Sequence, residues 1–180
     1  MRAVLDACVL YPTVLREILV GVAARGGFTP LWSARILAEW QRAAARTGPA
    51  DAVIAAGEIA HLRSLWPMAE ITADPGLEAR LDLPDPADKH VLASTITAQA
   101  DRIITLNLRD FPARLVQTEG VQRAESPDDF LMALWLDKPE TVEAAVHAAR
   151  TATEAASGRA QPLRPLLKRA KLPRLGKALE

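Results

Sequence analysis

Two short, mostly apolar runs stand out in this chain, and segments with helical spacing of their apolar residues lie between and after them. The first run covers residues 3–10 and the second covers residues 102–106. Runs of this length are typical of strands that are buried on both faces of a parallel sheet. Strands that alternate with helices predict an α/β fold, with three α/β/α layers around a parallel sheet.

The segments between and after these runs have recognisable starts and stops. We expect helices over 13–27, 33–48, 51–65 and 85–100, a short strand at 68–72, mostly loop at 73–86, and a last strand at 120–124. Ser33 and Ser126 are good N-caps, and the order Asp85, Pro86, Asp88 is typical of a helix start. From Pro127 onward the pattern is helical, with a hinge at 156–162. We therefore predict a domain over 1–125 and a helical extension over 126–180.

Composition and charge indicate the cellular compartment and limit the kinds of binding site that the chain can form. Basic and acidic residues balance, yet from Gly158 onward seven basic residues face one acid, Glu180. Such a tail suits phosphates or an acidic partner, or is simply a solvated helix face. The single cysteine, Cys8, excludes an intrachain disulfide and a cysteine-based metal site. The N-terminus lacks a signal-peptide pattern and no apolar run approaches the ~20 residues of a membrane span, so we expect a cytoplasmic protein with no membrane partner.

Carboxylates lie beside the apolar segments at four places. Asp6 lies inside the first run, and Asp88 begins the inward stripe of the helix expected over 85–100. Glu39 lies at the edge of an apolar helical stripe, and Asp110 follows the second run, three residues after Asn107. Each position also has a structural interpretation: a hydrogen-bonded buried acid for Asp6, a helix-dipole partner for Asp88, a solvated charge for Glu39, and a helix cap for Asp110.

The joint arrangement of these acids is more informative than any one of them. In a parallel sheet, ligands bind at the carboxyl ends of the strands, where these acids would meet. A close pair of carboxylates repels by ~4 kcal/mol at 4 Å with an effective dielectric constant near 20. A divalent cation removes that cost, and an all-oxygen site suits Mg²⁺ or Mn²⁺.

Four motifs in order resemble a known family. They are "VLDACVLYP", the glutamate of "ILAEW", "DPADKHVLASTITAQAD" and "IITLNLRDFP". Together they resemble the PIN domain, and most of all the VapC-like toxins of type II toxin–antitoxin systems. The resemblance covers about residues 1–130, and the helices after it resemble the C-terminal extension of one VapC-like subgroup. It implies a PIN-like fold, a metal-dependent endoribonuclease that cuts RNA, and a cognate antitoxin as partner.

The resemblance also implies roles for individual residues. Asp6 matches the first-strand acid of the family, Glu39 the helix acid, and Asp88 the third acid. At the fourth position the family often has an acid where this chain has Asn107, and Asp110 is the nearest replacement. Asp6, Glu39, Asp88 and Asp110 are thus the expected catalytic acids, and with Asn107 they are the expected ligands of Mg²⁺ or Mn²⁺.

Two neighbouring residues have less certain roles at this point. Cys8 stands where the family commonly has Asn, which puts in doubt a supporting hydrogen bond from this position. We interpret His90, next to Asp88, as structural or surface-exposed because it points to another face of its helix.

Other functions stay open on the sequence alone. A phosphohydrolase with Asp6 as nucleophile requires a second Asp two residues later, where this chain has Cys8. A non-catalytic module that binds RNA or protein is the other alternative, because Asn107 replaces an acid. The apolar residues Phe130, Leu131 and Leu134 need a surface to cover, so the extension should pack on the domain or on a second copy in a homodimer.

Overall fold

The computed structural model describes residues 1–180 and contains one sheet with helices before, between and after its strands. The strands are β1 (Arg2–Leu5), β2 (Thr29–Ser33), β3 (Glu70–Ile71), β4 (Arg102–Ile104) and β5 (Arg123–Glu125). The helices up to the last strand are α1 (Ala7–Leu10), α2 (Thr13–Ala24), α3 (Ala34–Thr47), α4 (Pro49–Leu65), α5 (Pro75–Arg80), the 3₁₀ turn η1 (Pro86–Asp88), α6 (Lys89–Thr97), the 3₁₀ turn η2 (Leu108–Asp110) and α7 (Ala113–Thr118). After β5 come α8 (Pro127–Asp137), α9 (Pro139–Ser157), α10 (Leu163–Arg169) and α11 (Pro173–Ala178).

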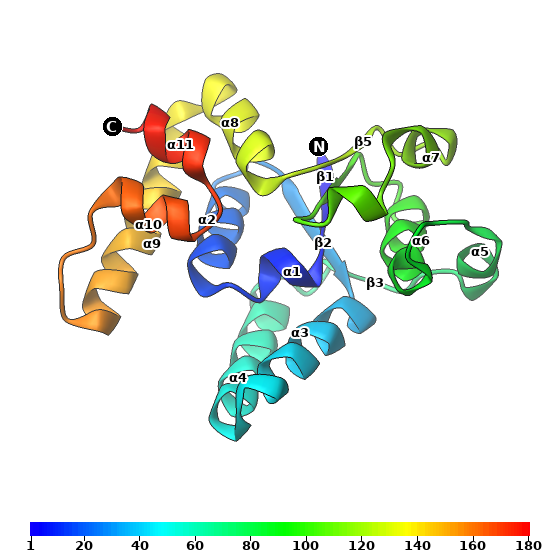
Figure 1. Ribbon diagram of the computed structural model, residues 1–180, viewed down its shortest axis with the longest axis horizontal. Helices are drawn as coiled ribbons and strands as arrows, with labels where there is room; N and C mark the ends of the chain where they lie inside the picture. Colours follow the sequence, from blue (N-terminus) through cyan, green and yellow to red (C-terminus); the bar gives the residue numbers. More distant parts are fainter. The chain divides into compact units, whose positions relative to one another are not determined.

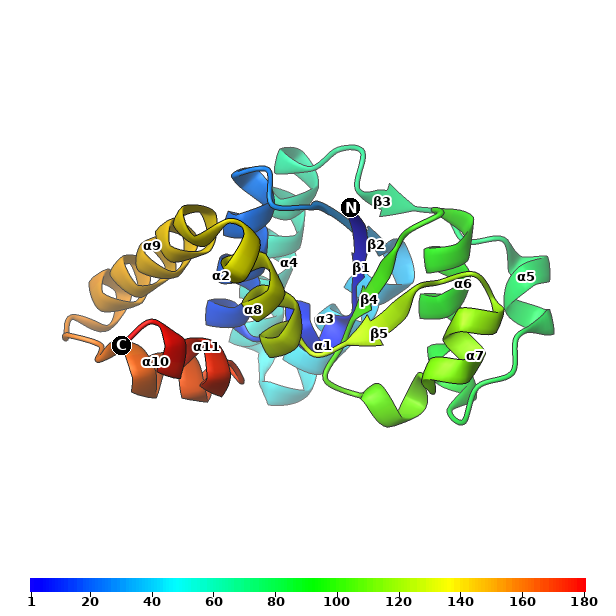
Figure 2. The same cartoon turned by 90° about the horizontal axis from the view of Figure 1, so that it is seen from above.

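The sheet has the strand order β3-β2-β1-β4-β5. β1 is parallel to β2 on one side and to β4 on the other, and β2 is parallel to β3. Figure 2 shows β1 between β2 and β4. Val4 pairs with Leu31 and with Ile103, and all three side chains are buried. The predicted three-layer α/β/α class with a parallel sheet and C-terminal helices is confirmed.

The chain divides by its contacts into two compact units, which we describe separately. The first unit contains Met1–Tyr11 and Thr29–Ala124, and the second contains Pro12–Phe28 and Glu125–Glu180. The second unit thus takes α2 from the N-terminal half of the chain, which the sequence pattern does not show. The division into domains at 125 and 126 stays a prediction.

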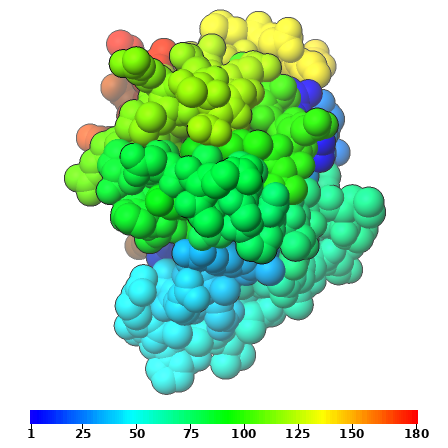
Figure 3. All heavy atoms as spheres, turned by 90° about the vertical axis from the view of Figure 1, so that its right-hand side faces the viewer, coloured from blue at the N-terminus to red at the C-terminus, as the bar shows by residue number.

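In the first unit, α3 and α4 form an antiparallel pair after β2. Ser33 ends β2 and caps α3, because its Oγ accepts the Ile36 amide at 3.2 Å, as predicted. Trp40 is buried on the inner stripe of α3. Figure 3 shows the α3–α4 pair in cyan at the lower end of one face, below the green segment that contains α5 and α6. Because α3 begins directly after β2, its first turns lie beside the carboxyl end of that strand.

The first apolar run was predicted as one strand over 3–10, and that extent is wrong. β1 ends at Leu5, and residues 7–10 form α1. Asp6 connects the two elements with an extended backbone, and its amide donates to the Ile104 carbonyl at 3.1 Å. The predicted loop at 73–86 also contains a helix, α5, whose N-cap Asp74 accepts the Gly76 amide at 2.8 Å.

The second unit is helical, and α2 packs on α9. Gly21 of α2 faces Ala145 of α9 so closely that a Cβ at position 21 would lie 3.2 Å from the Ala145 Cβ. Phe28 and Phe130 make an edge-to-face pair with centroids 4.9 Å apart. In the region of the predicted hinge, α9 ends at Gly158 with a left-handed backbone, φ 66°. Figure 1 shows α10 and α11 next to each other after this break.

A buried carboxylate joins α8 to α11 within this unit. Asp128 is 6% exposed, and its two oxygens accept the amides of Arg174 and Leu175 at 2.9 and 3.0 Å. Because those amides open α11 and have no partner within it, Asp128 stabilises the helix start. Among the basic residues of the tail, Arg164 pairs with Glu180, Arg174 pairs with Asp129, and Arg169 donates to Gln161.

None of the helices combines the length and the apolar character that a membrane span requires.

Candidate functional site

Asp6 lies at the carboxyl end of β1, almost buried, with one of its two oxygens held by neighbours. Its Oδ2 accepts the Thr105 hydroxyl at 2.7 Å and the Cys8 thiol at 3.1 Å. Thr105 is fully buried and in turn accepts the Asn107 amide at 3.0 Å. The parallel pairing of β1 with β4 brings these residues together although they are 99 positions apart. The other oxygen of Asp6 remains available for a ligand.

Cys8 supports Asp6 as a hydrogen-bond donor. Its sulfur also accepts the Leu106 amide at 3.2 Å, so the thiol is fixed between two segments. Burial raises the pKa of Cys8 to about 12, and the negative charge of Asp6 adds to this shift. The thiol therefore stays protonated at neutral pH and can donate to the carboxylate. This is the supporting hydrogen bond that the Cys8 substitution put in doubt.

Asp88 ends the 3₁₀ turn before α6 and faces Asp6. Asp85 caps the turn instead, because its Oδ1 accepts the Ala87 amide at 2.8 Å, whereas Asp88 makes no side-chain cap bond. The pKa of Asp88 is raised to about 6, and burial is the largest cause. The negative charge of Asp6 is the next cause, and smaller contributions come from Asp85, Asp110 and Glu39. The neighbouring carboxylates thus add to the effect of burial, which is the larger cause.

Glu39 reaches the same space from α3. Its Oε1 lies 3.9 Å from Arg35, 3.7 Å from Arg42 and 2.9 Å from His90 Nε2. His90 is 2% exposed, and neither of its ring nitrogens makes a well-directed hydrogen bond. We had interpreted His90 as structural or surface-exposed. It is buried, as a structural residue would be, but it also contacts an expected site residue, which the sequence did not indicate.

Asn107 and Asp110 differ in their position. Asn107 lines the pocket described below, and Asp110 does not. Asp110 is partly buried, lies 3.8 Å from the Arg109 guanidinium, and acts on Asp88 through its charge. It does not cap α7, because the N-cap residue of that helix is Pro112, without a side-chain cap bond.

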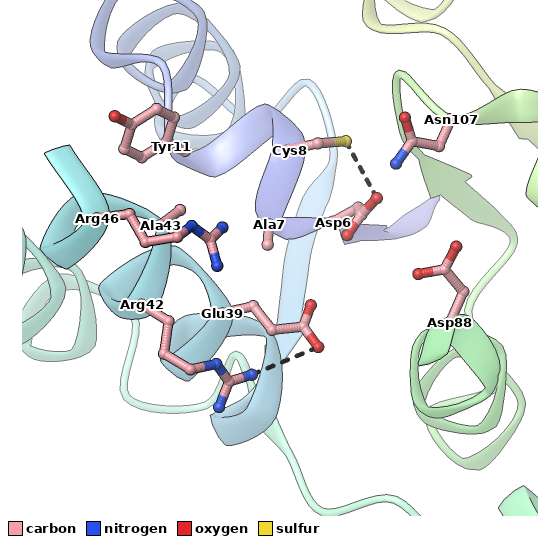
Figure 4. A pocket seen from close by; sticks show the side chains of 10 residues that line it. All are labelled: Asp6, Ala7, Cys8, Tyr11, Glu39, Arg42, Ala43, Arg46, Asp88 and Asn107. Carbon is pink, nitrogen blue, oxygen red and sulfur yellow. Dashed lines mark hydrogen bonds and ion pairs between the residues drawn. The ribbon is translucent and has the colours of Figure 1, made fainter. Parts of the chain in front are cut away.

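One pocket of the first unit collects most of the predicted site residues. Asp6, Cys8, Glu39, Asp88 and Asn107 line one end, and Tyr11, Arg42 and Arg46 line the other. Figure 4 shows the carboxylates of Asp6, Glu39 and Asp88 directed into a common space, with Asn107 opposite α3. We call this the acid pocket. Side chains from β1, α3, η1 and the turn after β4 thus meet at the carboxyl ends of the central strands.

The family of the chain follows from a comparison with family models. The model described as the PIN domain matches residues 2–109, which include Asp6, Glu39, Asp88 and Asn107. The chain belongs to the PIN domain family. PIN domains are generally nucleases and typically use divalent metal ions. A comparison with curated proteins gave no match, and neither did a comparison with solved structures.

The acid pocket of this PIN domain suits a hydrated cation better than a fully protein-bound one. Its donors are carboxylate and amide oxygens. The neighbouring carboxylates add to burial in raising the pKa of Asp88, and a cation would relieve that repulsion. Yet no three of the His, Cys, Asp and Glu side chains are arranged to hold an ion together. Mg²⁺ keeps several waters and binds through one or two carboxylates, so Asp6 and Asp88 fit as direct ligands. The ligand roles of all five residues stay predictions: Asp6, Asp88, Glu39, Asp110 and Asn107.

Proposed function

We propose that this PIN domain is a metal-dependent endoribonuclease that uses Mg²⁺ or Mn²⁺ at the acid pocket. The observation that carries the proposal is the pair Asp6 and Asp88, which face one another at the strand ends with a raised Asp88 pKa. When bound, the ion would place positive charge at the scissile phosphate and help to generate a nucleophile from water. The family supports nuclease chemistry, and the resemblance to VapC-like toxins supports RNA as the substrate.

Neighbouring residues would hold the pocket carboxylates in position. The Thr105 hydroxyl and the Cys8 thiol fix one oxygen of Asp6, so its free oxygen has a defined direction toward the ion. His90 limits the movement of Glu39 from the opposite side. Positioning of this kind is the main contribution that a protein makes around a catalytic ion.

The test is RNA cleavage with defined metals. Purified protein is incubated with total RNA in EDTA, Mg²⁺ or Mn²⁺, and new RNA ends are sequenced. We expect cleavage with Mg²⁺ or Mn²⁺, none in EDTA, and none for Asp6→Asn. Asp82→Asn is the matched control, because Asp82 is exposed and outside the pocket. Cleavage by Asp6→Asn at the wild-type rate would reject this site.

The two alternatives give other results in the same experiment. A non-catalytic binding module would bind RNA without producing new ends in any metal. The lack of three acids placed to hold one ion together favours it. A phosphohydrolase would form an aspartyl-phosphate on Asp6. The thiol of Cys8 occupies the place of the second Asp that such chemistry requires, and it donates to Asp6 instead.

We further propose that the biological role is that of a toxin whose activity a cognate antitoxin blocks by covering the acid pocket. The resemblance to VapC-like toxins is the support for this role. Expression of the chain alone should arrest growth, and Asp6→Asn should remove the arrest. Harmless expression of an enzyme that cleaves RNA in vitro would indicate another role for the nuclease.

A further inference from the structure

The acid pocket is larger than one ion requires. Its volume is about 380 Å³, whereas a water molecule occupies ~30 Å³ in the liquid. A cation with its waters fills only part of this space. The remaining part lies toward Tyr11, Arg42 and Arg46, and Figure 4 shows these side chains apart from Asp6 and Asp88.

One face of α3 supplies both an acid and two bases to the pocket. Glu39, Arg42 and Arg46 follow one another at positions i, i+3 and i+7, which lie on the same side of a helix. With a rise of 1.5 Å per residue, Glu39 and Arg46 are about 10 Å apart along the axis. That separation is several times an Mg²⁺–oxygen distance of about 2 Å, so Arg46 serves a group beyond the ion.

Arg46 is the cation of this pair that remains free for a ligand. Arg42 lies 3.7 Å from Glu39, which neutralises part of its charge. No ion pair and no hydrogen bond holds the exposed side chain of Arg46. A free guanidinium at the mouth of a pocket is well suited to a phosphate, which it binds with two parallel hydrogen bonds.

Tyr11 places an aromatic ring in the lining of the same part of the pocket as Arg46. The ring is 40% exposed, and its hydroxyl shares a hydrogen bond with Thr47 Oγ1 at 3.1 Å. Thr47 is the last residue of α3, directly after Arg46. The contact therefore fixes the ring at the end of the helix that carries the arginine. An exposed, fixed aromatic ring and a cation in the lining of one pocket are the combination that binds single-stranded nucleic acid by stacking and charge.

We propose that Tyr11 and Arg46 form a strand-binding subsite for single-stranded RNA. The phosphate of a nucleotide next to the cleaved bond binds Arg46, and the base of that nucleotide stacks on Tyr11. The subsite thereby sets which bond of the strand reaches Asp6 and Asp88. This inference rests on the proposed ribonuclease function and adds the residues that hold the substrate strand.

Arg46 also has a purely structural interpretation, which the experiment must distinguish from phosphate binding. It lies in the last turn of α3, where a positive charge stabilises the helix dipole. Arg46→Lys keeps that charge and loses the two parallel hydrogen bonds to phosphate. Tyr11→Phe keeps the ring and loses the Thr47 contact, whereas Tyr11→Ala loses both.

The experiment measures binding of a fluorescein-labelled single-stranded RNA oligonucleotide by anisotropy over a series of salt concentrations. All variants are made in an Asp6→Asn background so that the RNA is not cut. We expect Arg46→Ala to weaken binding roughly tenfold and to lower the salt slope by ~0.7, the value for one phosphate contact on a single strand. Arg46→Lys should keep the slope. Tyr11→Ala should weaken binding roughly tenfold, and Tyr11→Phe should stay near the parent.

Arg114→Ala is the matched control, since Arg114 is exposed on α7 and lies outside the pocket. With Asp6 restored, Arg46→Ala and Tyr11→Ala should also change the distribution of cut positions. If the RNA is bound and cut but both variants behave like Arg114→Ala, the subsite is rejected while the ribonuclease function stands. If the wild type neither binds nor cuts RNA, the ribonuclease function fails first and the subsite with it.

Discussion

The Nε2 atom of His90 lies 2.9 Å from Oε1 of Glu39, and so the first turn of α6 contacts α3 inside the first unit. The histidine is buried on all sides, whereas Glu39 is partly exposed to the acid pocket. His90 can therefore hold the Glu39 carboxylate in place although His90 itself does not line the pocket.

His90→Phe should lower cleavage through loss of the support for Glu39. Changes to residues that position metal-site carboxylates typically cost about 10–100-fold in metal affinity or activity. Metal titration and cleavage rates measure the effect, and circular dichroism checks the fold. His61→Phe is the matched control, because His61 is exposed on α4. Equal activity of the two variants would show that the contact with Glu39 is only packing.

Asp88→Asn should stabilise the metal-free protein at neutral pH. The pKa of Asp88 is raised to about 6 from an ordinary value of 3.8, with burial as the first cause. Between these values the folded state holds a proton that the unfolded state has released. The stability from Asp88 is therefore complete below pH 3.8 and is lost as the pH rises through 6.

The size of this effect is modest because Asp88 is only half-buried. We expect Asp88→Asn to gain about 1 kcal/mol at pH 7.5 after allowance for solvent screening, and to match the wild type near pH 4. Urea unfolding in EDTA at both pH values measures it, with Asp82→Asn as control. A gain that is the same at both pH values would contradict the assignment.

Cys8 should resist alkylation in the folded protein. Its pKa is raised to about 12 by burial and by Asp6, so almost no thiolate is present at pH 8.5. Iodoacetamide labelling followed by mass spectrometry should be slow in buffer and fast in urea at that pH. Asp6→Asn should speed labelling only partly, since burial is the larger cause. Equal rates in buffer and in urea would show an open, ionised thiol.

Asp110→Ala should weaken metal binding more than Asn107→Ala. Asn107 lines the pocket and Asp110 does not, yet the charge of Asp110 reaches Asp88. A carboxylate contributes a full charge to the field around a cation, and an amide contributes only a dipole. Calorimetric titration of Mn²⁺ into both variants compares them. A larger loss for Asn107→Ala would identify the amide as the direct ligand.

Asp128→Ala should destabilise the second unit by about 1–3 kcal/mol, since it leaves the buried Leu175 amide and the part-buried Arg174 amide without their acceptor. Asp129→Ala, which removes an exposed pair with Arg174 and an N-terminal contact to Ser126, should cost less. Urea unfolding monitored by tryptophan fluorescence compares them. Equal losses would show that the buried acceptor has no special weight.

The sequence predicted the fold and the three carboxylates of the acid pocket for identifiable reasons. The two apolar runs locate β1 and β4, and parallel pairing then brings Asp6 next to Thr105 and Asn107. The cap at Ser33 and the helical spacing after it locate Glu39 on α3. Local patterns of this kind depend on neighbouring residues only, and they are strong in this chain.

What the sequence missed depends on contacts between distant segments. His90 was assigned to another face of α6, but residues 90–95 are all buried, so this part of the helix has no solvent side. The first run was read as one strand because periodicity cannot separate a buried strand from a buried helical turn. Nothing in residues 13–24 shows that their partner lies more than a hundred positions later.

The packing of α2 on α9 gives the order of synthesis a physical meaning. Residues 13–24 leave the ribosome long before Pro139–Ser157. The apolar residues of α2, which include Leu15, Ile18 and Leu19, are therefore synthesised well before α9, on which α2 packs. Contacts so distant in sequence form slowly and leave apolar surface open to aggregation. A nascent chain that stops at Ala124 would carry the whole acid pocket and still have an uncovered helix. Almost a third of the chain must therefore follow Ala124 before the unit that contains α2 is complete.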